Sequence, residues 1–373
     1  MRYLNLLLLL LVFQSCEGQS EEDPVVKNEL LIGGPFENRD LFFDGMPEEI
    51  NSVDTSDSWA NAKQRLLITG TIFGSDGRTP VSGVILYYYH TDENGYYSGE
   101  SIHGDLRGWV KSDVNGQYSI YTSRPAAYPD SDEPAHIHPT ILESVADYPY
   151  YLDAFVFDDD KLLTTAKRNA MENRGGSGVL RLIKSDSYDI AEHDIFLGLN
   201  IPNYPVEDNA NRNSGKKIGE DLTSFTPYHV WGADKGSTAC PICKYGKHQG
   251  ILYFTGENAD LVEIEDWLVF FEEESIRRGG LLKVYMMIND ERIAPMDLEQ
   301  MGKKLNIQHV ALTIGNEKEM AKNGINLEVD NTVMIYRRSN IVDKYIDLKP
   351  IMENQELLSR RLEETEGAFL GRK

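Results

Sequence analysis

YPDSDEPAHIH, at residues 128–138, places one tyrosine shortly before a His-x-His pair. If residues 135–139 run as a strand, side chains two residues apart share a face, so His136 and His138 point the same way. Two imidazoles on one face of a strand can hold one metal ion. The stretch therefore predicts a strand and a candidate metal site together, with Tyr128 just upstream.

A second tyrosine completes the candidate site. It is the last residue of the turn-like segment DENGYY at residues 92–97. Phenolate oxygens are hard, anionic donors that stabilise ferric over ferrous iron, and two imidazoles complete a site that keeps an open position. Any one of the 20 tyrosines, chosen blind, would more often have a packing role, so the prediction depends on the whole set. The predicted ligands of Fe(III) are Tyr97, Tyr128, His136 and His138.

Length and composition bound the class of protein. A chain of 373 residues exceeds one ordinary domain and predicts two. Its hydrophobic content of 41% and charged content of 26% are those of a soluble globular protein with sizeable cores. The formal net charge of -23 argues against nucleic-acid binding, which needs clustered Lys and Arg on one face.

The N-terminus predicts export. Arg2 gives a short basic region, residues 6–13 are an unbroken apolar run, and Ser15 precedes Cys16. Residues 1–15 therefore read as a secretory signal that is too short to span a bilayer. The segment resembles a bacterial lipoprotein signal, which implies a lipid on Cys16 and a membrane anchor. An ordinary cleaved signal that leaves a free cysteine is the alternative.

Residues 16–60 are polar and acidic, and we interpret them as a tether leading into irregular structure. The run EGQSEED after Cys16 is similar to the acidic tether that sends lipoproteins to the outer surface in Bacteroidetes-type bacteria. The predicted location is therefore the cell envelope, at the outer membrane or the cell surface.

Residues 61–202 predict an all-β sandwich. Short apolar runs, such as residues 66–73 and 84–89, alternate with turn signals such as SDGRTP and DVNG. No long amphipathic helix is expected between residues 65 and 200. Short strands at this spacing are typical of two packed antiparallel sheets.

The same region resembles the intradiol ring-cleavage dioxygenases, the catechol and protocatechuate dioxygenase family. The resemblance covers residues 66–200, and single motifs are weak whereas their order and content together are specific. The motifs are LITGTI at 67–72, DG at 76–77, PVSGV at 80–84, DENGYYS at 92–98, LRG at 106–108, SDVNGQY at 112–118, RPAAYP at 124–129 and PAHIH at 134–138.

The resemblance implies a ferric enzyme that opens an aromatic ring between two adjacent hydroxyls, with a small aromatic diol and O2 as substrates. Matched position by position, the family's ligands fall on Tyr97, Tyr128, His136 and His138. In the implied mechanism the substrate replaces Tyr128, the axial tyrosine by family order, and a bound hydroxide takes a substrate proton. Dioxygen then attacks the activated ring, and a muconate-type diacid leaves.

Three positions depart from the family pattern. Glu133 stands where typical members carry an arginine that stabilises negative charge on the substrate, Ala154 replaces a frequent glutamine, and Tyr89 replaces a tryptophan. Arg107 or Arg124 could supply the missing positive charge as part of the catalytic set. A non-catalytic β-sandwich that binds a metal, or an aromatic or polymeric ligand, is the alternative.

The second half of the chain has a different spacing of apolar residues. Residues 203–219, rich in Asn, Arg, Lys and Gly, predict a linker. In residues 220–350 strands alternate with segments of helical spacing, which indicates an α/β sheet with helices on its faces. This region resembles a thioredoxin-like domain. The charged tail at residues 351–373 predicts a surface helix that frays.

A C-x-x-C pair, Cys240 and Cys243, comes before the first predicted strand of this sheet, in a loop rich in Gly and Lys. Such a pair can cycle between dithiol and disulfide, which predicts thiol-disulfide oxidoreductase activity. In thioredoxins the pair follows the first core strand and faces a cis-proline, where this chain has Asn331, so a structural disulfide is the alternative. A zinc site completed by His229 or His248 lacks the usual spacing. The sequence leaves the oligomeric state open.

Overall fold

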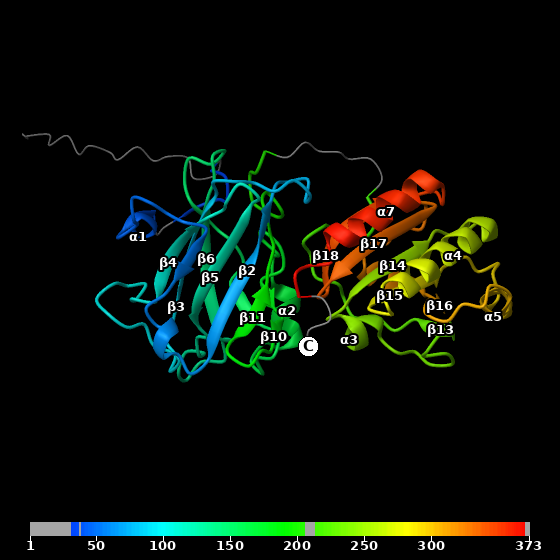
Figure 1. Cartoon of the computed structure of the whole chain (residues 1–373), viewed down its shortest axis with the longest axis horizontal. Coiled ribbons are helices and arrows are strands. Elements are labelled where there is room, and N and C mark those ends of the chain that lie inside the picture. The colour runs from blue at the N-terminus through cyan, green and yellow to red at the C-terminus, as the bar shows by residue number, and fades with distance from the viewer. Residues whose placement is uncertain (1–30, 37–38, 206–212, 370–373) are drawn as a thin grey trace, which may run out of the picture.

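The computed structural model describes residues 31–36, 39–205 and 213–369. They form two units that lie side by side, an N-terminal unit of two sheets and a C-terminal unit of one sheet with helices (Figure 1). The predicted signal at residues 1–15, the predicted lipidation site Cys16 and the tether up to residue 30 lie outside the described residues. Within the described residues, no helix has both the length and the apolar character that crossing a membrane requires.

The first sheet of the N-terminal unit is built on one long strand that pairs with three others. Its strands are β1 (Val53–Thr55), β2 (Arg65–Phe73), β5 (Gln117–Ser123), β10 (Leu182–Ile183), β11 (Asp189–Glu192) and β12 (Ile195–Phe196), and the 3-10 turn η2 (Trp59–Asn61) precedes β2. β2 pairs antiparallel with β5 and parallel with β11 and β12. The Leu, Ile and Thr residues of β2 suit such a central, half-buried strand.

The second sheet carries the predicted metal ligands. Its strands are β3 (Ile85–His90), β4 (Arg107–Lys111), β6 (His136–Leu142), β7 (Tyr150–Tyr151), β8 (Phe155–Phe157) and β9 (Val179–Leu180). β6 lies at its centre, between β3 and β8, and pairs antiparallel with both. The strand that carries the His-x-His pair is therefore held between two hydrogen-bonded neighbours.

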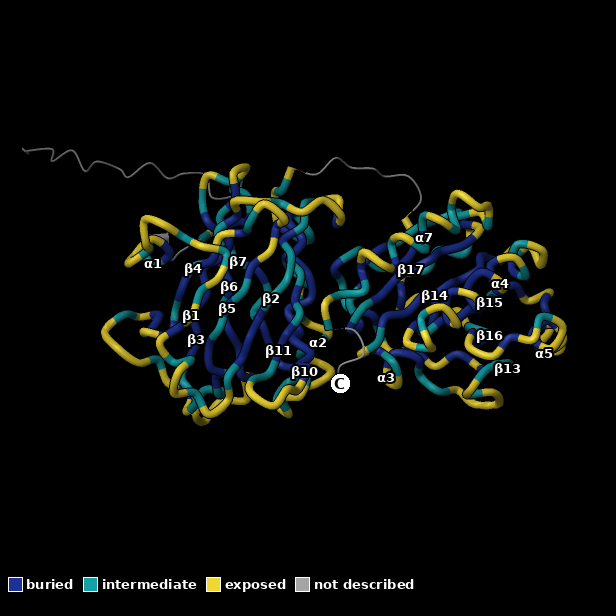
Figure 2. The backbone as a smooth tube through the Cα atoms, in the orientation of Figure 1, coloured by how far each residue is buried: buried dark blue, intermediate teal, exposed yellow. Residues whose placement is uncertain are grey.

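The two sheets pack face to face around one core. Leu66 and Ile68 of the first sheet and Leu86 and Ile137 of the second are fully buried in the same apolar cluster. Figure 2 shows these strands as a buried interior with exposed loops at both ends. The predicted β-sandwich is confirmed. Between residues 65 and 200 the chain forms one short helix, α2 (Thr165–Ala170), so the prediction of no long helix there is also confirmed.

The tether predicted at residues 16–60 is wrong for its described part. From residue 31 onward the chain packs on the sandwich through a short helix, α1 (Arg39–Phe43), and through β1, which pairs parallel with β5. Phe42 is fully buried against Tyr87, and its carbonyl accepts a hydrogen bond from the Trp109 indole at 2.8 Å. The tether was predicted from the average composition, which is polar and acidic. The few apolar residues of the segment nevertheless anchor it on the sandwich.

The C-terminal unit has one mixed sheet, in the order β13-β16-β15-β14-β17-β18. Its strands are β13 (Tyr228–Trp231), β14 (Gln249–Thr255), β15 (Leu282–Ile288), β16 (Ala311–Ile314), β17 (Asn331–Arg337) and β18 (Asn340–Ile346). β14, β15 and β16 run parallel, whereas β17 is antiparallel to both β14 and β18. All seven residues of β14 are buried, because the sheet is covered on both faces.

Helices connect these strands as the spacing predicted, with two additions. The helices are α3 (Pro241–Tyr245), α4 (Leu261–Arg277), α5 (Pro295–Lys304), α6 (Glu317–Lys322) and α7 (Met352–Glu364). Asp260 is the N-cap of α4, and its carboxylate accepts the Val262 N–H at 2.8 Å. The helix buries Trp267 and Phe271. The predicted alternation of strands and helices is confirmed, while α3 and α6 were not expected.

The helix predicted in the tail at residues 351–373 is present as α7, but its expected fraying is wrong for this helix. Leu358 and Leu362 are fully buried in the core that α4 and the sheet share, and Gln249 donates a hydrogen bond to the Leu362 carbonyl at 2.8 Å. Two leucines four residues apart face the same side of a helix. Because the surrounding residues are charged, the sequence did not predict that this side would be buried. α7 is therefore a packed element of the C-terminal unit.

Residues 203–219 were predicted as a linker, yet both of their described ends are packed. The Tyr204 hydroxyl donates to Glu143 at 3.0 Å in the sandwich, and Ser214 is buried with its hydroxyl 2.6 Å from that of Thr332. Polar composition alone does not show which side chains find partners. The segment therefore ends as ordered structure on each unit.

Buried ion pairs join the two units. Glu192 and Asp194, at the end of the first sheet, meet the turn between β17 and β18. Arg338 Nε lies 3.0 Å from Glu192, and Arg337 lies 2.5 Å from Asp194, with every side chain in these pairs at least 86% buried. Buried charges of this kind are stable only when paired. The pairs therefore fix how the units dock.

Candidate metal centre

His136 and His138 lie at the start of β6, on the same side of the sheet. Strand pairing sets His138 opposite Tyr89 of β3 and His136 opposite Val156 of β8. The Nε2 atoms of the two imidazoles are 2.9 Å apart. The strand expected at residues 135–139 is present, beginning at His136, and the two imidazoles converge as alternation along a strand requires.

Tyr97 and Tyr128 reach the same point from two different loops. Their phenolic oxygens are 2.7 Å apart, and the Tyr128 oxygen lies 3.5 Å from His138 Nε2. The four predicted ligands thus form one connected set of donor atoms. We call Tyr97, Tyr128, His136 and His138 the candidate metal centre.

Local turn chemistry positions the two tyrosines. The Asp92 carboxylate accepts the backbone N–H groups of Asn94 and Tyr96, at 2.8 and 3.0 Å, and closes the turn before Tyr97. Gly95 has φ of +87°, and a Cβ there would come within 2.1 Å of the Ala127 carbonyl oxygen. Only glycine allows this loop to touch the segment that carries the second tyrosine.

The donor atoms fit one metal ion. A metal–nitrogen bond of about 2.1 Å, repeated at right angles, separates two ligand atoms by about 3 Å, which agrees with the His136–His138 and Tyr97–Tyr128 distances. His136 Nδ1 lies 2.7 Å from the Pro134 carbonyl, an arrangement that places its proton on Nδ1 and leaves Nε2 free to coordinate. Two imidazoles and two phenols are a donor set suited to a hard cation.

Protonation states agree with this fit. Burial, followed by the neighbouring imidazole of His136, lowers the pKa of His138 to about 3, so the ring is a neutral base at pH 7. Burial, and then the hydroxyl of Tyr128, raises the pKa of Tyr97 above its ordinary value. A cation is therefore needed to hold Tyr97 as a phenolate. Among the described residues, no cluster of three His, Cys, Asp or Glu side chains could hold a metal, so this site depends on its tyrosines.

Aromatic rings support the centre from one side. The Tyr89 ring stacks on His138 at 4.5 Å between centroids and on His103 at 3.7 Å, so it lies between two imidazoles. His103 Nδ1 is 2.8 Å from the Tyr87 hydroxyl. Packing and hydrogen bonds of this kind fix the orientation of a ligand imidazole.

Comparison with known proteins gives a partial match. The chain is 28% identical over 148 residues to catechol 1,2-dioxygenase of Acinetobacter baylyi, a match that covers 31% of this chain and 47% of that protein. It is 31% identical over 98 residues to chlorocatechol 1,2-dioxygenase of Pseudomonas sp. strain P51, covering 26% of this chain and 36% of that protein. Part of this chain is catechol-dioxygenase-like.

The chain spans half the length, or less, of the curated relatives it matches. No protein-family model matches it. Among solved structures, the dioxygenase domain of a carbohydrate-binding fusion protein from Streptomyces sp. SirexAA-E is 19% identical, over 41% of this chain and 91% of that chain, with a TM-score of 0.32. We use the term dioxygenase-like domain for the β-sandwich.

Each of the two arginines predicted to serve the site pairs with a carboxylate. Arg107 lies 3.1 Å from Asp44, and Arg124 pairs with Asp159 at 2.7 Å while its guanidinium covers the Phe157 ring. Glu133 is exposed in the loop before β6. Each guanidinium thus already faces a carboxylate, and the role of Arg107 or Arg124 in stabilising negative charge on the substrate stays a prediction.

Sequence reasoning missed two residues beside the centre. Tyr89 was noted only as a departure from the family, and His103 was not singled out. The contact of Tyr89 with His138 follows from the pairing register of β3 and β6, which no local motif encodes. His103 lies in a loop without a recognisable motif. The only signal in the sequence is that histidine is a common metal ligand.

The C-x-x-C pair forms a disulfide at the start of a helix. Cys240 and Cys243 are bonded to each other, and Cys240 is the N-cap of α3, which follows β13. The prediction of a loop at this point is wrong, because Pro241 begins a helical turn. The zinc alternative is also wrong, since both sulfurs are in the disulfide and His229 Nε2 bonds to the Ala239 carbonyl at 2.9 Å.

Proposed function

We propose that the dioxygenase-like domain is a non-haem Fe(III) enzyme that uses O2 to cleave the ring of a catechol-type aromatic between its two hydroxyls. One observation carries the proposal: the donor atoms of four side chains lie within hydrogen-bond distance of one another in sequence. These side chains are Tyr97, Tyr128, His138 and His136. The partial similarity to proteins named catechol and chlorocatechol 1,2-dioxygenase supports the substrate class.

The residues of the centre divide the work. Ferric iron, when bound, supplies a Lewis-acidic position that can take both oxygens of a catechol and make its ring reactive toward O2. His136 and His138 come from one strand and are the fixed donors. Tyr97 supplies a negative donor that balances the charge of the cation.

Tyr128 is the residue that we propose to move a proton. It comes from a loop, and its oxygen contacts both the Tyr97 oxygen and His138 Nε2. A catechol that enters the centre would displace Tyr128, because a loop residue moves at less cost than residues in a paired strand. The displaced Tyr128 oxygen is then placed to take a proton from a substrate hydroxyl.

A metal-binding module without ring-cleaving activity is the second candidate. The observation that favours it is charge: Glu133 is acidic where the family pattern has arginine, while Arg107 and Arg124 are paired with Asp44 and Asp159. Such a domain would hold iron through the same four side chains. Both candidates predict coloured, iron-loaded protein, and only the first predicts oxygen consumption.

The remaining proposals concern the rest of the chain. We propose a thioredoxin-like fold for residues 220–350, supported by the strand order β18-β17-β14-β15 and by the crossing of α4 between two parallel strands. We also propose that the chain is an envelope lipoprotein anchored through Cys16, at the outer membrane or cell surface. The support for this is the signal-like sequence of residues 1–16.

Oxygen consumption by the iron-loaded full chain tests the main proposal. The protein is loaded with Fe(III), its visible absorption is recorded, and O2 uptake is followed with a panel of catechols, with Tyr128→Phe alongside. Wild type is expected to show a tyrosinate-to-iron band and uptake, and Tyr128→Phe is expected to lose most of the uptake.

Tyr96→Phe is the matched control, because Tyr96 adjoins the centre in sequence but is 60% exposed. It should keep both the band and the uptake. Protein that stays colourless with added iron would remove the iron proposal. Coloured protein that consumes no O2 with any catechol would instead favour the binding module.

A further inference from the structure

The Cys240–Cys243 disulfide is unsymmetrical toward solvent. Cys243 is exposed, whereas Cys240 is partly buried and packs against the apolar cluster that contains Phe225 and Ile242. An attacking thiolate must approach along the S–S axis, so access decides which sulfur it reaches. Cys243 is therefore the more exposed end of the disulfide, and we expect a partner from solution to reach it first.

Hydrogen bonds also distinguish the two sulfurs. The Cys243 backbone N–H donates to Cys240 Sγ at 3.1 Å. A negative charge that develops on Cys240 would be stabilised there, because hydrogen bonds to an anion are stronger than those to a neutral group. In the oxidised protein Cys243 Sγ carries no proton, so the Ser224 hydroxyl is the donor in their 3.5 Å contact.

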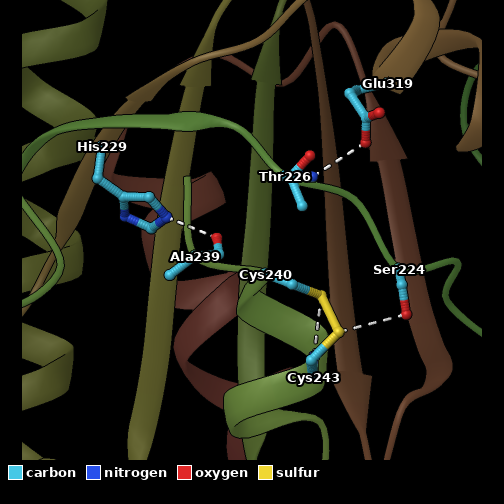
Figure 3. Close-up of a disulfide and its surroundings, with 7 residues drawn as sticks. All are labelled: Ser224, Thr226, His229, Ala239, Cys240, Cys243 and Glu319. Carbon is cyan, nitrogen blue, oxygen red and sulfur yellow. Dashed lines mark hydrogen bonds between the residues drawn. A yellow bond between two sulfur atoms is a disulfide. The ribbon is translucent and has the colours of Figure 1, made fainter. Parts of the chain in front are cut away.

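Both sides of the disulfide are held in place (Figure 3). His229 is fully buried, and its Nε2 bonds to the Ala239 carbonyl, which fixes the backbone just before Cys240. The Thr226 N–H donates to Glu319 at 2.9 Å, which ties the segment that carries Ser224 to α6. The donors around the sulfurs are therefore positioned before any reaction occurs.

We propose that this disulfide is a reversible thiol-exchange site in which Cys243 is the attacked sulfur and Cys240 the leaving sulfur. A thiolate of an external dithiol bonds to Cys243 Sγ, the Cys240–Cys243 bond breaks, and its electron pair goes to Cys240 Sγ. The second thiolate of the dithiol then attacks the first sulfur of the same dithiol, which is bonded to Cys243 Sγ. That bond breaks and Cys243 leaves as a thiolate. The dithiol is oxidised by two electrons and the protein pair is reduced.

The partner class is a dithiol or a disulfide on an exposed protein segment, since Cys243 and Ser224 both lie at the surface. In the reduced protein Cys243 is the accessible nucleophile, with the Ser224 hydroxyl as its donor. In this scheme the second cysteine of the C-x-x-C motif forms the mixed disulfide with the partner, and the first cysteine does not. The proposal is independent of the iron chemistry, because none of its residues belongs to the candidate metal centre.

Trapping the mixed disulfide in the native full chain tests which of the two cysteines is attacked. The protein is exposed briefly to glutathione, free thiols are capped with iodoacetamide at once, and the tryptic peptide 236–244, which holds both cysteines, is sequenced by mass spectrometry. We expect glutathione on Cys243 and the cap on Cys240, at least tenfold over the reverse. Cys16 falls in a different peptide and does not interfere.

The reverse distribution, or equal amounts, would overturn the assigned order. A disulfide that dithiothreitol reduces only after the protein unfolds would overturn the exchange site altogether and leave a structural bond.

A second measurement examines Ser224. In Cys240→Ser protein, Ser224→Ala should slow alkylation of Cys243 at pH 7 about threefold, because the thiolate loses its hydroxyl donor. Thr238→Ala is the control, since Thr238 is an exposed hydroxyl residue two positions before Cys240. Equal rates for the Ser224→Ala and Thr238→Ala variants would exclude Ser224 as the donor.

Discussion

His136 and His138 present their Nε2 atoms to each other at 2.9 Å, on one side of a strand that is hydrogen-bonded along both edges. Two acceptor nitrogens at this distance repel each other unless a proton or a cation lies between them. Burial lowers the pKa of His138, which disfavours the proton at neutral pH. The arrangement is thus most stable with a shared cation.

The proposed iron site requires both imidazoles. For His136→Gln we expect the iron content per chain to fall at least tenfold, because one donor of the set is lost. Metal analysis after dialysis measures it, and the unfolding midpoint of iron-free protein shows whether the fold is retained. Full iron occupancy in a folded variant would contradict the assignment of His136 as a ligand.

The ring of Tyr89 should matter more than its hydroxyl. Tyr89→Leu removes the ring that stacks between His103 and His138, and we expect iron affinity to fall about tenfold or more. Tyr89→Phe keeps the ring and should retain affinity within about threefold. Competition with a chelator measures both. Similar losses in the two variants would mean that the hydroxyl, and not the stack, supports the site.

Phe42 should be essential to the sandwich although it lies in a segment of polar composition. Phe42→Ala removes a fully buried ring and is expected to lower the free energy of unfolding by about 3–5 kcal/mol. The neighbouring Phe43 is 39% exposed, so Phe43→Ala is the matched control and should cost less than about 1 kcal/mol. Urea unfolding measures both, and equal losses would mean that residues 39–43 do not pack as described.

The two units should unfold together because of the ion pairs between them. Arg338→Ala leaves Glu192 buried without its partner, and we expect a loss of about 3–5 kcal/mol or a split into two transitions. Arg360→Ala is the control, since Arg360 is exposed and its pair with Glu364 is 3.9 Å long. Calorimetry of the full chain distinguishes the outcomes. Two separate transitions in wild type would contradict coupled unfolding.

Stability should fall in mild acid. Burial lowers the pKa of His90 and of His193 from 6.5 to about 4. Between these values the unfolded chain binds protons that the folded chain does not, so the free energy of unfolding decreases as pH falls from about 6.5 toward 4. At pH 5 each imidazole accounts for a loss of about 2 kcal/mol.

Urea unfolding at pH 7 and pH 5 checks this expectation. His193→Gln lacks one of the histidines whose pKa is lowered, so the difference between its two measurements should be smaller than in wild type. An unchanged difference would show that His193 does not contribute to the pH dependence.

The sequence predicted what local chemistry determines. Strands and turns of the sandwich follow from short apolar runs and turn motifs, and the two histidines of β6 share a side because strand side chains alternate. The loop before Tyr97 was readable for the same reason, since Asp92 and Gly95 specify its turn.

Long-range pairing explains what was missed. The stack of Tyr89 on His138 depends on the register between β3 and β6, and the partners of Arg107 and Arg124 depend on distant carboxylates. Averaged composition misled in two places: Phe42 anchors a polar segment, and Leu358 and Leu362 anchor a charged helix. In each case a few buried side chains outweighed the character of their surroundings.

The packing of residues 31–60 on the sandwich sets the reach of the proposed anchor. A 45-residue tether could extend to about 150 Å, whereas the chain from Cys16 to residue 31 spans at most about 50 Å when fully stretched. If Cys16 carries a lipid, residue 31 of the dioxygenase-like domain lies within about 50 Å of the membrane surface. Aromatics that partition at the membrane would then be in range of the domain, while polymers fixed farther out would not.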